Sequence, residues 1–338
     1  MDGLDPHERP PDSIRNIYKK YQKLKSKALD EDENIVDFEH ETQALNGSKV
    51  RIVKHLESTH LQACFQKFAG EPFQDFGPRK NMAVYEHADM PGLHMIPSLL
   101  PPSLQQLLLS RLLHRDLSNP SHLTNIHTHY AVTYPPSHRS FFSIPPSSQD
   151  PVATPLDPTV HKPLTISQLL SRKLRWTTLG GQYDWTEKKY PDAAPPAFPK
   201  DVRDLLEGIF TDTAAEAAIV NLYSPGDTLS VHRDVAETSA TGLVSVSLGC
   251  DAIFVIGSSG DGHADRVLTL RLRSGSAVYM SGASRFAWHG VPQIVPGTCP
   301  DYLVDWPGSA DGEGDYQDWK GWMANKRVNL NVRQMQDI

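Results

Sequence analysis

Polar and apolar side chains alternate most clearly over residues 327–333, which read Arg-Val-Asn-Leu-Asn-Val-Arg. Side chains point to opposite faces of a strand in turn, so the arginines and asparagines share one face and the aliphatic residues share the other. The apolar face predicts packing on a core. The polar face predicts anion binding, because guanidinium groups pair with carboxylates through charged hydrogen bonds. Its members are Arg327, Asn329, Asn331 and Arg333.

Short apolar runs typical of strands recur through the second half of the chain. They cover residues 218–223, 243–248, 252–256, 267–272 and 277–280. Several short strands separated by turns predict a sandwich or barrel of the jelly-roll type. Residues 257–262 are rich in glycine but lack the lysine and the serine or threonine of a phosphate-binding loop, so we interpret them as a hairpin turn.

Helical spacing of apolar residues is clearest near the N-terminus. Residues 14–29 place isoleucine, tyrosine and leucine at helical intervals with basic residues between them. This pattern predicts a helix docked on the domain with a solvated basic face, and contact of that face with nucleic acid is the alternative. We expect further helices near residues 54–68 and from the prolines at 101–102 to residue 113, with a short strand at 92–96 between them.

The chain divides by pattern into an extension and one large domain. Residues 1–75 predict an N-terminal helical and flexible extension, and residues 76–338 predict the main domain. Prolines and serines crowd residues 134–163. Because proline lacks a backbone donor, this stretch predicts an insertion on the surface.

Composition narrows the class of protein. The 338 residues carry a formal net charge of −7, which argues against a protein that coats nucleic acid through many phosphate contacts. Cys64, Cys250 and Cys299 are widely spaced, so we expect no disulfide framework, no cysteine zinc site and a reducing compartment. No apolar run reaches the roughly 18 residues of a spanning helix, and the first residues lack a signal-peptide core. We therefore expect a soluble, intracellular monomer with no membrane partner.

Two histidines and one aspartate form the candidate metal site. His232 and Asp234 lie two positions apart and so point the same way from an extended segment, and His289 follows later in the chain. Two histidines and one carboxylate make the facial triad of non-haem Fe(II) oxygenases, which leaves coordination positions open. His127 and His129 have no accompanying carboxylate or third ligand, and we interpret them as ordinary histidines.

Together these motifs resemble the AlkB family of Fe(II)- and 2-oxoglutarate-dependent dioxygenases. The matching segments are residues 221–223, 232–234, 281–289 and 327–333. Residues 173–191 resemble the branch that contains AlkB homologue 1. The resemblance covers roughly residues 90–338. It implies a mainly β fold with flanking helices (α+β), built on a double-stranded β-helix, or jelly-roll, core.

The resemblance also implies which residues hold which ligands. Iron(II) would be held by His232, Asp234 and His289, and O2 and 2-oxoglutarate would be the cosubstrates. Contacts to 2-oxoglutarate would come from Asn221, Tyr223, Arg327, Asn329, Asn331 and Arg333. One of the two arginines can instead brace Asp234, and the sequence leaves their roles open. The family's strand usually has threonine where this chain has Asn331.

An aromatic and basic cluster in residues 172–190 predicts the substrate surface. Aromatic rings stack on flipped or single-stranded bases while cations contact phosphates. We therefore assign Trp176, Tyr183 and Trp185 to the base and Lys188 and Lys189 to phosphates, with packing in the core as the alternative.

The resemblance implies oxidative demethylation of an N-methylated base. Relatives in the family oxidise N-methyl groups of DNA or RNA bases, so the nucleic acid would be tRNA carrying 1-methyladenine or DNA carrying N6-methyladenine. The products would be formaldehyde, succinate, CO2 and the unmodified base. The alternatives are a protein-directed 2-oxoglutarate hydroxylase or demethylase, and a nucleic-acid-binding module with a degenerate site.

Overall fold

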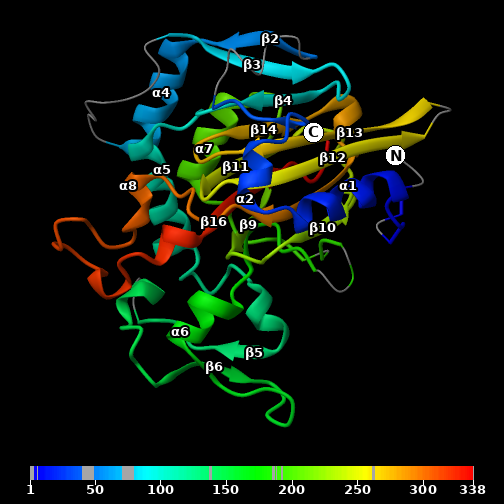
Figure 1. Ribbon diagram of the computed structural model, residues 1–338. Helices are drawn as coiled ribbons and strands as arrows, with labels where there is room; N and C mark the ends of the chain where they lie inside the picture. The colour runs from blue at the N-terminus through cyan, green and yellow to red at the C-terminus, as the bar shows by residue number, and fades with distance from the viewer. Residues whose placement is uncertain are drawn as a thin grey trace.

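Two β-sheets form the body of the molecule, and a small third sheet projects from it (Figure 1). The computed structural model describes residues 4–5, 7–39, 49–70, 80–136, 139–184, 187, 189–191, 193–260 and 263–337. The eight-stranded sheet has the order β2 (Val50–Leu56), β3 (Met82–His87), β4 (Leu93–Ile96), β14 (Ala277–Met280), β11 (Leu243–Gly249), β16 (Arg327–Arg333), β9 (Ala217–Tyr223) and β8 (Trp176–Gly180). The five-stranded sheet has the order β1 (Ile35–Val36), β13 (His263–Leu272), β12 (Ala252–Gly260), β15 (Trp288–Ile294) and β10 (Leu229–His232).

Successive strands of the C-terminal half are divided between the two sheets. Strands β9, β11, β14 and β16 lie in the larger sheet, and β10, β12, β13 and β15 lie in the smaller one. This division is that of a jelly roll, so the predicted fold class, mainly β with flanking helices, is confirmed. The five predicted strands are present, but β12 continues to residue 260, so most of the predicted turn at 257–262 is strand.

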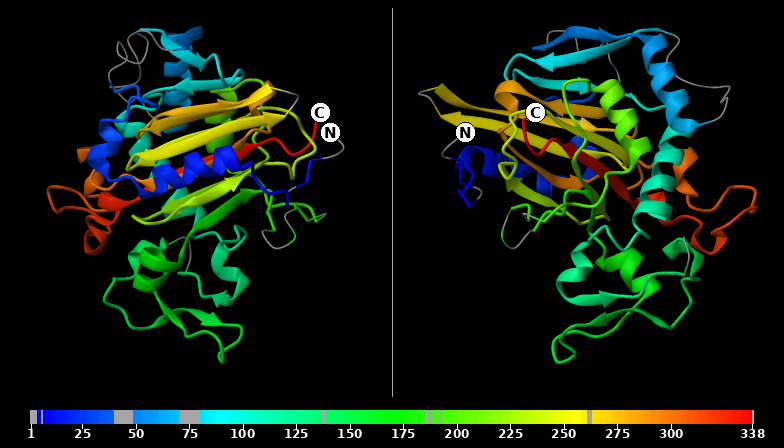
Figure 2. Two further views of the ribbon diagram at one scale, coloured as in Figure 1. Left: turned by 45° about the vertical axis from the view of Figure 1, so that its right-hand side comes forward. Right: turned by 180° about the vertical axis from the view of Figure 1, so that it is seen from behind.

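The longer helices lie on two sides of the molecule. Helix α1 (Asp12–Lys23) packs on β15, β12 and β13 of the smaller sheet and buries Ile14, Tyr18 and Tyr21. Helices α4 (Ser58–Ala69) and α7 (Lys200–Ile209) pack on each other. Figure 2 shows them with α5 (Pro102–Ser110) on the side of the molecule away from α1.

The first predicted helix is docked as expected, but it is interrupted. Helix α1 ends at Lys23, and α2 (Ser26–Asp30) follows as a separate short helix. The side-chain amide of Gln293 on β15 donates to the backbone carbonyls of Tyr21 and Leu24. These bonds satisfy carbonyls that a helix end leaves without partners, so the smaller sheet supports the end of α1.

The N-terminal residues add strands to both sheets. Strand β1 pairs in parallel with β13, and β2 pairs with β3 at the edge of the larger sheet. The predicted helix at 54–68 is α4, except that residues 54–56 belong to β2. The described parts of residues 1–75 are therefore packed against the main body, and the boundary near residue 75 stays a prediction.

The proline-rich region belongs to a small sheet of its own. Strands β5 (Tyr130–Val132), β6 (Pro151–Pro155) and β7 (Leu164–Thr165) form it. The ring of Phe142 meets those of Trp319 and Trp322 edge-on, with centroids 5.5 and 5.1 Å apart, and this contact fixes the small sheet to the C-terminal part of the chain. Among the described residues, no helix has both the length and the apolar character needed to cross a bilayer.

Candidate metal and cosubstrate site

Strand β16 has the two faces that its sequence predicts. Val328, Leu330 and Val332 are fully buried on one face. On the other face Asn329 lies opposite Ser247 of β11 and Asn221 of β9, because directly paired residues of antiparallel strands share a face. Arg327, Asn329 and Arg333 of the polar face are buried as well and Asn331 is half-buried, so the charged groups lie inside the jelly roll.

The two histidines and the aspartate of the predicted triad meet at the edge of the smaller sheet. His232 ends β10 and is directly paired with His289 of β15. Nε2 of His232 lies 3.5 Å from Oδ1 of Asp234, and Nε2 of His289 lies 3.7 Å from Oδ2 of the same carboxylate. The three possible ligand atoms lie within 4.8 Å of one another, a spacing that suits one metal ion.

Backbone carbonyls orient both imidazole rings. Nδ1 of His232 donates to the carbonyl oxygen of Ser230 at 2.8 Å, and Nδ1 of His289 donates to that of Ala287 at 3.0 Å. A carbonyl can only accept a hydrogen bond, so the neutral rings carry their proton on Nδ1 and keep a lone pair on Nε2. Both lone pairs are therefore available to a metal beside Asp234.

The electrostatic surroundings prepare the same groups for a cation. Burial and the neighbouring His232 lower the pKa of His289 to about 4, so His289 is neutral at pH 7. Burial by itself would raise the pKa of Asp234, but Arg333 and the two histidines hold it well below its usual value. Asp234 is therefore an ionised carboxylate, as metal binding requires.

The two arginines of β16 have different partners. Nη1 of Arg333 donates to Glu237 at 2.9 Å, and Nη2 lies 3.5 Å from Oδ2 of Asp234. Arg327 is 1% exposed, and Nη2 donates to the hydroxyl of Ser247 at 2.9 Å. Within the described part of the chain, Arg327 forms no ion pair with a carboxylate, and its Nε and Nη1 have no hydrogen-bond partner.

A buried cation without a counter-ion is costly, so the surroundings of Arg327 suit an anionic ligand. The ring of Tyr223 lies 5.5 Å from its guanidinium, and the Tyr223 hydroxyl also lacks a partner among the described residues. Oδ1 of Asn331 also has no hydrogen-bond partner among the described residues. Asn329 is held in place, because its amide donates to the Ser245 hydroxyl at 2.7 Å and to the Val246 carbonyl at 3.0 Å. The unmatched N–H groups of Arg327 and the hydroxyl of Tyr223 can donate to a carboxylate of 2-oxoglutarate, whereas the Asn331 oxygen can only accept a hydrogen bond.

A cleft of about 320 Å³ opens beside the triad. Its size is that of a small-molecule site. It is lined by Tyr183, Ile219, Asn221, Thr228, Leu229, Ser230, His232, Arg233, Asp234, Val235, Ala236, Asn331 and Arg333. Five of the nine predicted metal and cosubstrate residues line this cleft. The other four, His289, Tyr223, Arg327 and Asn329, are not part of its lining.

The predicted substrate aromatics are placed only in part. Tyr183 lines the cleft, and its ring meets that of Tyr190 edge-on with centroids 5.3 Å apart. Trp176 of β8 is directly paired with Asn221, so its half-buried side chain shares the face of β9 that carries Asn221. Lys189 is exposed. Trp185 and Lys188 lie outside the described residues.

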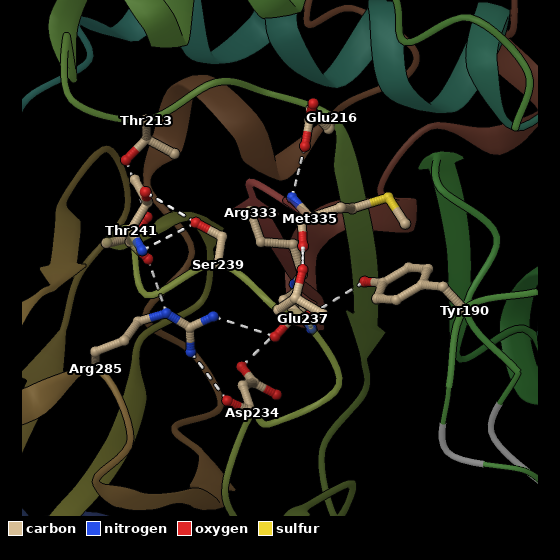
Figure 3. A network of polar contacts seen from close by, with 12 residues as sticks. Tyr190, Thr213, Glu216, Asp234, Glu237, Ser239, Thr241, Arg285, Arg333 and Met335 are labelled. Carbon is tan, nitrogen blue, oxygen red and sulfur yellow. Dashed lines mark hydrogen bonds and ion pairs between the residues drawn. The ribbon is translucent and has the colours of Figure 1, made fainter. Parts of the chain in front are cut away.

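Two charged residues beside the triad were not predicted from the sequence. Glu237 and Arg285 are both buried and form an ion pair at 3.1 Å (Figure 3). Neither belongs to an alternating strand pattern, and no spacing in the sequence connects them. The one signal in the sequence was the position of Glu237, a charged residue between the predicted ligand Asp234 and the predicted strand at 243–248.

Removing any one of the three ligand side chains is expected to abolish divalent metal binding. The variants are His232→Ala, Asp234→Ala and His289→Ala, and the control is His129→Ala, an exposed histidine outside the cluster. Binding of Mn(II) to the full chain is measured from the electron paramagnetic resonance signal of the free ion. A triad variant that binds Mn(II) like the wild type would exclude that residue as a ligand.

Mn(II) binding is also expected to weaken on acidification. Hydrogen bonding to Asp234 and its negative charge outweigh burial and raise the pKa of His232 above 6.5, so this ring gains a proton before His289 does. A proton on Nε2 competes with the metal, so affinity falls as pH falls through the pKa of His232 and recovers as pH rises. The same Mn(II) titration at a series of pH values measures this effect. Constant affinity between pH 8 and pH 5 would contradict it.

Comparison with known proteins agrees with this geometry. Residues 92–333 match the sequence profile of the 2OG-Fe(II) oxygenase superfamily. The chain is 44% identical to the N6-methyladenosine RNA demethylase ALKB1 of Pyricularia oryzae, over 99% of this chain and 98% of that protein. It is 53% identical to the N6-methyladenosine RNA demethylase ALKBH of Cryphonectria parasitica, over 63% of this chain and all of that protein.

A third relative, with lower sequence identity, is also named a demethylase of RNA. The chain is 38% identical to the tRNA demethylase abh1 of Schizosaccharomyces pombe, over 80% of this chain and 86% of that protein. Members of the superfamily use iron(II), 2-oxoglutarate and O2, which confirms the expected cofactor and cosubstrates. The chain therefore belongs to the 2OG-Fe(II) oxygenase superfamily, as a dioxygenase of the AlkB family close to the AlkB homologue 1 branch.

Proposed function

We propose that this dioxygenase oxidatively demethylates N-methylated bases of nucleic acid, and that methylated adenine in RNA is the substrate to test first. The observation that carries the proposal is a group of three metal-ligand side chains facing a buried arginine, Arg327, that has no carboxylate partner among the described residues. The names of the relatives support the substrate class, since two are N6-methyladenosine RNA demethylases and one is a tRNA demethylase.

His232, Asp234 and His289 would hold the iron through two Nε2 atoms and one carboxylate. Arg333 keeps Asp234 ionised and in place through its contact at 3.5 Å. Arg327 would bind the distal carboxylate of 2-oxoglutarate, with a hydrogen bond from the Tyr223 hydroxyl. Asn221 and Asn331 line the cleft together with His232 and Asp234 and would hold the cosubstrate by their side-chain amides.

When bound, iron(II) with O2 and 2-oxoglutarate supplies the oxidising power, so that one oxygen atom enters a C–H bond of the N-methyl group and the other enters succinate as CO2 is lost. The resulting N-hydroxymethyl group then breaks its C–N bond. The hydroxyl proton is lost as formaldehyde leaves, and the electron pair of the C–N bond stays on the base nitrogen, which takes up a proton in the N6 case. The protein's part is to orient the methyl group toward the site and to exclude water from it.

Trp176 and Tyr183 would receive the methylated base. Tyr183 lines the cleft beside the candidate metal site, together with the small residue Ala236. An aromatic wall suits a base because the flat ring can stack on it. Lys189 is exposed and would contact a phosphate of the flanking strand. Trp185 and Lys188 were assigned to the substrate surface from the sequence, and for them this assignment stays a prediction.

Incubation with methylated nucleic acids tests the function directly. The full chain, with iron(II), ascorbate and 2-oxoglutarate, is given RNA carrying N6-methyladenosine, tRNA carrying 1-methyladenosine, DNA carrying N6-methyladenine, or a methylated peptide. We expect formaldehyde to equal the methyl groups lost from nucleic acid, measured by mass spectrometry of the nucleosides, and the Asp234→Ala variant to be inactive. Turnover of the methylated peptide alone would replace this proposal with a protein-directed one.

Arg327→Gln is expected to raise the 2-oxoglutarate concentration needed for half-maximal turnover. A hydrogen bond to a charged group contributes about 1.5–3 kcal/mol, which corresponds to a rise of roughly 10- to 100-fold. The matched control is Arg266→Gln, an exposed arginine of β13, which should leave the requirement unchanged. An unchanged requirement in folded Arg327→Gln would place the cosubstrate elsewhere.

Tyr183→Ala and Trp176→Ala are expected to weaken binding of methylated RNA at every salt concentration. Stacking on an aromatic ring contributes about 1–3 kcal/mol per base and depends little on salt. Lys189→Ala should instead flatten the salt dependence, because phosphate contacts weaken as salt rises. Tyr302→Ala, a half-buried tyrosine of α8 (Asp301–Val304), is the control, and thermal unfolding checks each variant. Parental binding by both folded aromatic variants would assign these rings to packing.

A further inference from the structure

A fully buried carboxylate lies at the centre of the polar network in Figure 3. The side chain of Glu237 is 0% exposed, and both of its oxygens accept hydrogen bonds. Oε1 accepts from Nη1 of Arg333 at 2.9 Å, and Oε2 accepts from Nη2 of Arg285 at 3.1 Å. The hydroxyl of Tyr190 adds a longer bond to Oε1 at 3.4 Å.

Arg285 continues the network to the backbone of the candidate metal ligand. Its Nη1 donates to the carbonyl oxygen of Asp234 at 2.9 Å, and its Nε donates to that of Thr241 at 2.8 Å. Arg285 therefore holds the main chain of Asp234, while Arg333 contacts the Asp234 carboxylate. Glu237 lies between the two guanidinium groups and fixes both.

The network joins the chain segments that carry the candidate ligands. Glu237 lies in the loop that follows β10, and Arg285 follows the short helix η5 (Gly282–Ser284) and precedes His289 by four positions. Arg333 ends β16 in the opposite sheet. A single buried carboxylate thereby connects the loop of Asp234, the approach to His289 and the cosubstrate strand.

Neutralising this carboxylate would leave two buried guanidinium groups with less opposing charge. Arg285 and Arg333 are 1% and 3% exposed, so water cannot replace the lost charge where they stand. Breaking one member of a buried ionic network is costly because the remaining charges are left uncompensated. The arginines would shift, and the carboxylate of Asp234 would lose its fixed direction toward the histidines.

We propose that Glu237 is a positioning residue that orients Asp234 for metal binding by holding Arg333 on its carboxylate and Arg285 on its carbonyl. This inference rests on the proposed function, because it requires that Asp234 binds the metal. Partners of metal ligands typically change metal affinity by about 10- to 100-fold when they are replaced. Glu237 acts through these two arginines, because its own side chain is fully buried and does not line the cleft.

The test compares Glu237→Gln with a matched variant of a neighbouring glutamate. Glu216 accepts hydrogen bonds from the backbone N–H groups of Met335 and Gln336 at 2.6 and 3.3 Å, and it has no contact with Asp234 among the described residues. Mn(II) binding to the full chain is followed by the electron paramagnetic resonance signal of the free ion. We expect about 10- to 100-fold weaker binding in Glu237→Gln and wild-type binding in Glu216→Gln.

A second readout separates positioning from a purely structural role. A disoriented metal site should consume 2-oxoglutarate without oxidising substrate, so the amount of formaldehyde formed per succinate should fall in Glu237→Gln. Lower stability alone would reduce the folded fraction, while leaving the Mn(II) affinity of the folded protein and this ratio unchanged. Thermal unfolding of both glutamine variants measures the stability effect separately.

Arg285→Lys keeps the inference testable if Glu237→Gln does not fold. Lysine retains the charge but lacks the planar fork that binds a carbonyl and a carboxylate together. We expect this variant also to bind Mn(II) more weakly than the wild type. If a folded Glu237→Gln or Arg285→Lys variant bound Mn(II) with wild-type affinity and formed as much formaldehyde per succinate as the wild type, this inference would be wrong. The proposed function would be unaffected. A wild-type chain that binds no Mn(II) would overturn the proposed function and this inference together.

Discussion

The contact between Arg333 and Asp234 is the interaction on which the site depends. Asp234 is a buried carboxylate, and without opposing charge it would take up a proton and lose its value as a ligand. Arg333 supplies that charge from the facing sheet at 3.5 Å. The packing of the two sheets must therefore bring the end of β16 close to the loop after β10, while the register of β16 with β11 and β9 fixes where Arg333 lies in its own sheet.

The same requirement for balanced charge distinguishes the two arginines of β16. Arg333 already has Glu237 and Asp234 as partners, so a ligand is not needed to neutralise it. Arg327 is equally buried, yet its one hydrogen-bond partner in the described structure is the neutral hydroxyl of Ser247, and no carboxylate pairs with it there. Arg333 is thus suited to organising Asp234, the proposed metal ligand, and Arg327 is suited to an incoming carboxylate.

The N-terminal residues pack against the strands that carry the two candidate histidine ligands. Helix α1 packs on β15 and β12, and Arg233, between the two ligand positions, lies over the ring of Trp288 at 4.3 Å. Glu8 forms an ion pair with the same arginine. The N-terminal residues therefore support the strands that carry His232 and His289, which the division of the sequence into an extension and a domain did not suggest.

The sequence by itself determined which residues share a face. Alternation of side chains placed Arg327 and Arg333 on one side of a strand, and His232 and Asp234 on one side of an extended segment, because the period of a strand is fixed by its backbone. The same local patterns identified the strands of the jelly roll and the family. Only the tertiary structure decided which partner each charge received. Glu237 and Arg333 are 96 residues apart in the chain, and Arg285 and Glu237 are 48 apart. Local pattern specifies the direction of a side chain, but an ion pair between distant segments depends on how the two sheets pack and on which charges lose their water.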